Sequence, residues 1–162
     1  CVPSAMYELS ILSLEIERMP KSSNYKFTDL DNLPYLSVCT TSTHDMSPIR
    51  LWWTENRNIT QQYYNEVLKY EGEAPEECSP QLCKQIIERH LRSAAMWVIL
   101  PWQDWLSIDN KLRNKDIESE RINVPANSEH YWNYRMHIPM EQLLSETELN
   151  NKIKKMCGSV SV

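Results

Sequence analysis

The chain has 162 residues, enough for one domain with a hydrophobic core. Its net charge is −5 and its acidic and basic residues are interleaved, so it lacks the basic cluster typical of nucleic-acid binding. No apolar segment approaches the roughly 20 residues that a membrane-spanning helix needs. We therefore expect a soluble protein with no nucleic-acid or membrane partner.

The five cysteines are odd in number, and no two are spaced as Cys-x-x-Cys. Zinc sites and disulfide frameworks usually show paired spacings, so we expect no metal and a reducing, cytoplasmic compartment. With only two glycines, the chain also lacks a phosphate-binding glycine loop, and we expect no cofactor. It begins at Cys1 and not at Met, which leads us to expect a processed product or a fragment.

Three short segments have the alternation or the β-forming composition of strands, namely residues 11–17, 35–41 and 95–100. Helices are expected over residues 3–9, 49–57, 60–70, 80–92, 103–108 and 140–156, and the charged segment 110–120 is expected to be exposed. Ser47-Pro48 and Ser79-Pro80 each have the pattern of an N-cap followed by the first helical residue. Strands that alternate with helices predict a parallel sheet, and three such strands leave open edges and a poorly covered face.

The segment from Thr40 to Asp45 ends the second expected strand and enters the loop before a helix. In parallel α/β folds, ligands bind at the carboxyl ends of the strands. His44 and Asp45 therefore lie where we expect a binding or catalytic site. From position alone an alternative stays open, in which Asp45 caps the following helix and His44 only packs.

The sequence from Tyr35 to Trp53 resembles the Thr-His-Asp segment of the 4-alpha-glucanotransferases, also called amylomaltases or disproportionating enzymes, which form glycoside hydrolase family 77. The resemblance extends over residues 2–144 and is most like the longer plant-cytosolic and Bacteroidetes-like branch. Three further blocks resemble the family in the same order, at residues 11–20, at residues 100–106, and at residues 120–127 with 131–136.

This resemblance implies an α/β fold, in which residues 1–144 form the C-terminal portion of a (β/α)8 TIM barrel, about its last three strands. Residues 145–162 would form the end of the terminal helix and a tail. The implied reaction is a retaining double displacement that moves glucosyl or glucan units from maltose or maltodextrin to a sugar 4-hydroxyl. The nucleophile and acid/base motifs of the family are missing from this sequence. We therefore expect the chain alone to be inactive and to need the remainder of the parent catalytic domain.

Within the resemblance, Asp45 corresponds to the carboxylate that stabilises the transition state, and His44 to a neighbouring sugar-binding imidazole. Gln103, Asp104, Asn123 and Trp132 are further candidates for substrate binding. For Gln103 and Asp104 the alternative is that they order loops without touching sugar, and for Trp132 it is structural packing.

Other residues have structural interpretations. We expect Cys39, Trp52 and Trp53 to belong to the core, and Glu15 and Glu17 to be polar residues of the barrel interior or rim. As an alternative function, the chain is a non-catalytic module for carbohydrate binding or protein interaction.

Overall fold

The computed structural model of the chain describes residues 2–132 and 134–158. Three parallel strands, β1 (Ser13–Ile16), β2 (Ser37–Thr40) and β3 (Trp97–Val98), form one sheet in the order β1-β2-β3. Each falls inside the segment predicted for it, so the predicted α/β class with parallel strands is confirmed. Cys1 and the last four residues of the expected tail lie outside the described residues.

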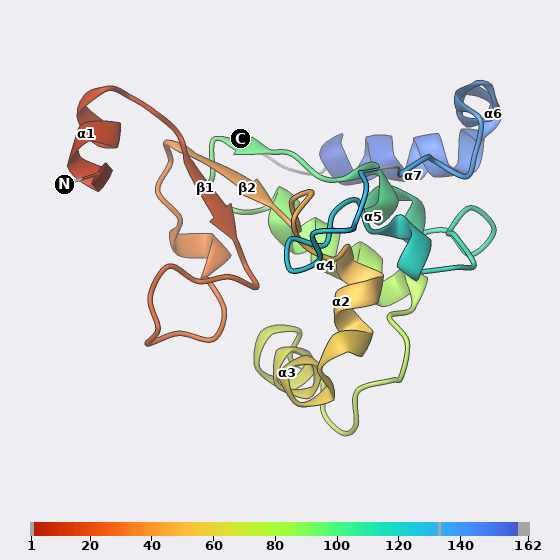
Figure 1. Cartoon of the computed structure of the whole chain (residues 1–162), viewed down its shortest axis with the longest axis horizontal. Helices are drawn as coiled ribbons and strands as arrows, with labels where there is room; N and C mark the ends of the chain where they lie inside the picture. Colours follow the sequence, from red (N-terminus) through yellow and green to blue (C-terminus); the bar gives the residue numbers. More distant parts are fainter. Residues whose placement is uncertain (1, 133, 159–162) are drawn as a thin grey trace.

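All the helices except α1 come after the first strand, and most lie on one side of β1 and β2 in Figure 1. None of the helices within residues 2–132 and 134–158 is long and apolar enough to cross a membrane. The helices are α1 (Val2–Glu8), α2 (Ile49–Glu55), α3 (Arg57–Gln62), α4 (Pro80–Leu91), α5 (Trp102–Ser107), α6 (Met140–Ser145) and α7 (Thr147–Gly158), with a π-helical turn at Tyr63–Val67 and 3-10 turns at Leu30–Asn32 and Glu118–Glu120.

The helix starts show where local sequence decides the structure. At α4, Ser79 Oγ accepts a hydrogen bond from the Leu82 amide, and Pro80 is the first residue, as predicted. At α2 the prediction was wrong, because Pro48 occupies the N-cap and Ser47 donates its hydroxyl to Glu55. The single helix expected over residues 140–156 is also wrong, because the backbone of residue 146 turns to ψ 66° and separates α6 from α7.

The main hydrophobic core lies among the helices α2, α4, α5 and α7. Trp53 and Ile87 are fully buried there, while Trp52 packs against the cluster and is only partly buried. A smaller cluster, formed by Leu30, Leu33 and Cys39, covers part of the sheet. The core positions expected for Trp53 and Cys39 are confirmed, and that expected for Trp52 is confirmed in part.

The two faces of the sheet differ in burial. The register pairs Leu14 with Val38 and Val38 with Trp97, so these side chains share one face. Leu14 and Trp97 are both about half exposed, whereas Cys39 on the opposite face is fully buried. The sheet therefore has the poorly covered face that three parallel strands were expected to leave.

Glu17, which directly follows β1, joins this strand to the helices. Its carboxylate is buried and accepts a hydrogen bond of 2.5 Å from the Tyr63 hydroxyl and one of 3.0 Å from Arg89. A buried carboxylate needs such donors, because an unsatisfied charge inside a protein is costly. Glu15 is also buried and binds Ser13 and Lys21. Glu17 thus joins β1 to the helical core, whereas Glu15 binds residues close to it in sequence.

We predict that Tyr63→Phe in the full-length protein lowers the free energy of unfolding by roughly 1–3 kcal/mol, because it leaves one oxygen of buried Glu17 without its hydroxyl donor. Urea denaturation followed by fluorescence measures the change. Tyr70→Phe is the matched control, because Tyr70 is partly exposed and stacks on Tyr64. Equal effects of the two substitutions would contradict this role of the Tyr63 hydroxyl.

Candidate active site

The loop between the end of β2 at Thr40 and the start of α2 at Ile49 carries His44 and Asp45. Both side chains are about half exposed, at 53% and 50%, and His44 Nε2 lies 3.3 Å from Asp45 Oδ2. Asp45 does not cap α2, because the first amide of that helix, Ile49 N, binds Asp104 Oδ1 at 2.8 Å. The helix-cap alternative for Asp45 is therefore wrong.

Two more predicted site residues join this pair from distant parts of the chain. Asn123 Nδ2 donates a hydrogen bond of 2.6 Å to Asp45 Oδ1. The ring of Trp132, which is 60% exposed, lies 4.7 Å from the His44 ring at an interplanar angle of 43°. We refer to His44, Asp45, Asn123 and Trp132 as the His44–Asp45 cluster. Its members bring together a carboxylate, an amide, an imidazole and an aromatic face, and all but the buried Asn123 are about half exposed or more.

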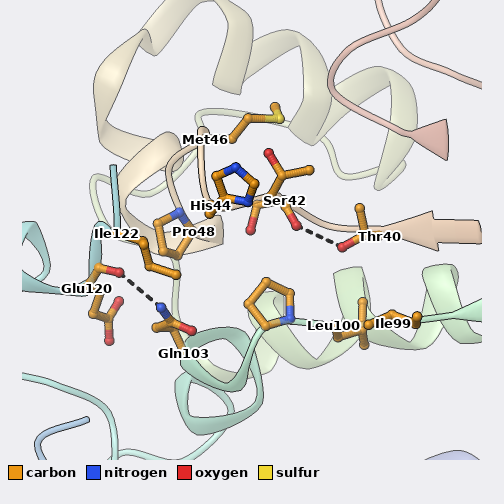
Figure 2. Close-up of a pocket in the computed structure, with 12 residues that line it drawn as sticks. Thr40, Ser42, His44, Met46, Pro48, Ile99, Leu100, Gln103, Glu120 and Ile122 are labelled. Atoms are coloured by element: carbon orange, nitrogen blue, oxygen red, sulfur yellow. Dashed lines mark hydrogen bonds between the residues drawn. The ribbon is translucent and has the colours of Figure 1, made fainter. Parts of the chain in front are cut away.

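A pocket of about 180 Å³ adjoins the cluster at the carboxyl ends of β2 and β3 (Figure 2). Its walls come from residues 40–48, from residues 99–103, and from Glu120 and Ile122. His44 and Gln103 both line it, and Gln103 Nε2 donates to the carbonyl of Glu120 at 3.2 Å. Asp45 does not line this pocket, but its contact with His44 puts its carboxylate at the edge.

Asp104 lies apart from the cluster, inside the protein. Its exposed fraction is 0%, and Oδ2 accepts a hydrogen bond of 2.6 Å from Thr41 Oγ1 while Oδ1 accepts one from Ile49 N. Burial raises the pKa of Asp104, and the two hydrogen bonds oppose that rise. The expected direct contact of Asp104 with substrate is not supported by this position. Of the two roles left open, its position favours ordering of the loop.

Glu120 is a pocket residue that the sequence analysis missed. We expected residues 110–120 to be exposed, but Glu120 is 1% exposed and Leu112 is also buried. Glu120 Oε1 lies 3.2 Å from Arg50 Nη1, and Oε2 has no hydrogen-bond partner among the described residues. The available signal was Arg50, an arginine between two apolar residues on the inner side of α2, which requires a buried anion.

Comparison with known proteins identifies the family of this chain. A profile of the 4-alpha-glucanotransferase family matches residues 1–141, and the chain therefore belongs to that family. Its fold is similar to that of an amylomaltase from Streptococcus agalactiae solved in complex with acarbose, with a TM-score of 0.68 and 13% sequence identity. That similarity covers 96% of this chain and 28% of the amylomaltase.

Relatives in sequence carry the same name. A 4-alpha-glucanotransferase DPE2 of Oryza sativa subsp. japonica is 34% identical over 159 residues, which is 98% of this chain and 17% of the rice protein. A 4-alpha-glucanotransferase of Chlamydia pneumoniae is 28% identical over 96% of this chain and 30% of the bacterial protein. The chain thus spans less than a third of the length of these relatives.

Burial of Glu120 predicts a specific pH dependence of stability. Burial raises the pKa of Glu120 from 4.5 to about 7, and the charge of Asp104 adds to this rise while Arg50 opposes it. Between these two values the folded state holds a proton that the unfolded chain releases, so stability falls as pH rises through this range. Glu120→Gln removes this dependence, because glutamine does not titrate.

We therefore expect the difference in unfolding free energy between Glu120→Gln and the wild-type full-length protein to change with pH. From pH 5 to pH 8 it should shift in favour of the variant by on the order of 2 kcal/mol. Thermal melts at both pH values measure the difference. Glu118→Gln, at an exposed position two residues away, should follow the wild type. A constant offset between Glu120→Gln and wild type at both pH values would contradict the raised pKa.

Proposed function

We propose that this chain is the C-terminal part of the catalytic barrel of a retaining 4-alpha-glucanotransferase, and that Asp45 stabilises the transition state. The observation that carries the proposal is the half-exposed Asp45 carboxylate, held by Asn123 beside His44 at the carboxyl end of a parallel strand. In α/β barrels, catalytic residues come from this end of the strands.

The open surfaces around the sheet support an assignment to a larger barrel. Leu14, Trp97 and Ile99 are exposed, and a hollow of about 810 Å³ lies between α1, β1 and residues 20–36. Three strands cannot close a barrel, so these surfaces need further strands to cover them. We propose that residues 1–144 complete the barrel with the remainder of the parent catalytic domain, and that α7, whose Leu149 and Met156 are buried in the main core, packs against this part of it.

The chemistry requires more acids than the cluster contains. A retaining glycosidase reaction uses a nucleophilic carboxylate and an acid/base carboxylic acid about 5–5.5 Å apart. The His44–Asp45 cluster contributes one carboxylate, and we propose that the remainder of the domain supplies the other two groups. The chain alone would then form no glycosyl intermediate.

The geometry of the cluster suits a carboxylate that grips sugar hydroxyls. Asn123 donates a hydrogen bond to Asp45 Oδ1, while Asp45 Oδ2 lies near His44 on the exposed side. A negative oxygen in this position stabilises the positive charge of an oxocarbenium-like transition state, and lowers the barrier when its contacts tighten there. His44 would bind the same sugar unit.

The substrate class follows from the surface beside the cluster. The exposed ring of Trp132 offers a flat apolar face of the kind that suits a sugar ring, and the Gln103 side chain adds polar groups in the pocket wall. We propose maltose or maltodextrins as donors and glucose or glucan hydroxyls as acceptors, in a cytoplasmic protein. The names of the relatives support this class.

We predict that Asp45→Asn in the full-length enzyme lowers kcat by about 10³-fold or more with the fold intact, because the neutral amide loses the charge that opposes the developing cation. Transfer of radiolabelled glucose into maltodextrin measures turnover, and circular dichroism checks the fold. The exposed Asp116→Asn is the control and should keep wild-type turnover. Near-normal turnover of Asp45→Asn would remove Asp45 from this role.

The same assay on the wild type separates the candidate activities. Incorporation of labelled glucose supports transfer, whereas release of reducing sugar without exchange would indicate an amylase. If neither reaction is observed, the alternative of a non-catalytic carbohydrate-binding module remains.

We expect the isolated 162-residue chain to show no transferase activity and to associate or unfold without a sharp transition, because the open face of the sheet exposes apolar side chains. Size-exclusion chromatography with thermal melting tests this expectation. A monomer that melts sharply would count against the barrel assignment.

A further inference from the structure

We propose that Asp104, together with Arg18, is a positioning residue that fixes both ends of the loop carrying Asp45. This inference rests on the proposed function, because its consequence is measured through Asp45. Asp104 lies in α5 and Arg18 follows β1, so two separate parts of the fold converge on the same loop.

Asp104 binds one group at each end of the loop. Its Oδ2 accepts from the Thr41 hydroxyl directly after β2, and its Oδ1 accepts from the Ile49 amide at the start of α2. One rigid carboxylate thereby sets the separation between the end of the strand and the start of the helix. Because Asp104 is fully buried, no water competes for these two donors.

Arg18 repeats this arrangement with the opposite charge. Its Nη2 donates to the carbonyl of Thr41 at 2.7 Å and to the carbonyl of Ser47 at 2.8 Å, and its Nε donates to Thr41 O at 3.2 Å. The guanidinium also lies 4.7 Å from the ring centroid of Trp52, which fixes its plane. Thr41 is thus held through its hydroxyl by an anion and through its carbonyl by a cation.

Asp45 lies four residues after Thr41 and four residues before Ile49, at the middle of the segment that these contacts anchor. Its side chain is half exposed, and Asn123 is its only hydrogen-bond donor from another element in the described part of the chain. The orientation of its carboxylate therefore depends on where the two loop ends are held. A displacement of about 1 Å in a catalytic group can lower turnover by about 10²-fold.

A purely structural role would not require charged groups at this place. A buried ion costs solvation free energy, and well-packed apolar residues often stabilise a fold as well or better. A carboxylate and a guanidinium that bind the same two loop ends instead provide directional contacts, which define a geometry. Contacts of this kind suit a positioning function.

The test is a double-mutant cycle in the full-length enzyme with Asp104→Asn and Asp45→Asn. Asparagine keeps the shape of Asp104 but has only one acceptor oxygen, so the Thr41 hydroxyl and the Ile49 amide can no longer both donate to this side chain. We expect Asp104→Asn to lower kcat by about 10- to 100-fold with KM changed less than about 3-fold. In the Asp45→Asn background, followed in single turnovers, the same change should cost less than about 3-fold.

Thr60→Val is the matched control. Thr60 is as buried as Asp104 and donates a hydrogen bond of 2.8 Å to the carbonyl of Trp53, away from the loop. It should lower the thermal midpoint and leave kcat within about 2-fold of wild type. If Asp104→Asn does not fold, Thr41→Val, which removes one donor to Asp104, takes its place in the same cycle.

The outcomes are distinct. The positioning role would be overturned if Asp104→Asn lowered kcat equally in the wild-type and Asp45→Asn backgrounds. It would also be overturned if Asp104→Asn left the kcat of an active enzyme unchanged. Both outcomes leave the proposed function intact. A wild-type full-length protein without transferase activity would instead refute the proposed function itself.

Discussion

The arrangement of this chain depends on one buried carboxylate. Asp104, in α5, joins the end of β2 to the start of α2, and so holds a strand and two helices in a fixed relation. A helix usually takes its N-terminal cap from the residue just before it, but α2 takes this contact from a residue 55 positions further along the chain. The loop between strand and helix therefore does not cap its own helix, and the Asp45 side chain lies half exposed, in contact with Asn123 and His44.

Around this carboxylate, buried acidic side chains and arginines connect segments that are distant in sequence. Arg18 shares the contacts of Asp104 at the loop, Arg50 pairs with Glu120, and Arg89 binds Glu17. Each of these contacts joins segments distant in sequence, so the charges fix how those segments lie relative to one another. Such pairs contribute little net stability, since the desolvation cost offsets their attraction. Stability comes instead from the apolar cluster of Trp53, Ile87 and their neighbours.

Most of the architecture could be predicted from local patterns. The three strands and the Ser79-Pro80 start of α4 were correct, because alternation and capping act over a few residues. His44, Asp45, Asn123 and Trp132 were nominated together through the family resemblance, and the fold brings them into contact. Their role toward sugar stays a prediction.

What could not be predicted depends on contacts across the fold. Ser47 has the local signature of a cap, but the Asp104 carboxylate from α5 accepts the hydrogen bond of the first α2 amide in its place. Glu120 lies in a charged segment that local sequence predicts to be solvated, and its burial depends on contacts with Arg50 and Gln103. The break between α6 and α7 at Glu146 has no Gly or Pro to mark it. The periodicity of the sequence therefore predicted a single helix where the structure has two.

The hydrogen bond between Asn123 and Asp45 spans 78 residues, and this spacing has a consequence for biosynthesis. A ribosome adds about 5–20 residues each second, so the amide that orients Asp45 is polymerised roughly 4–16 seconds after it. The nascent polypeptide therefore carries Asp45 for several seconds before the amide that orients its carboxylate has been made.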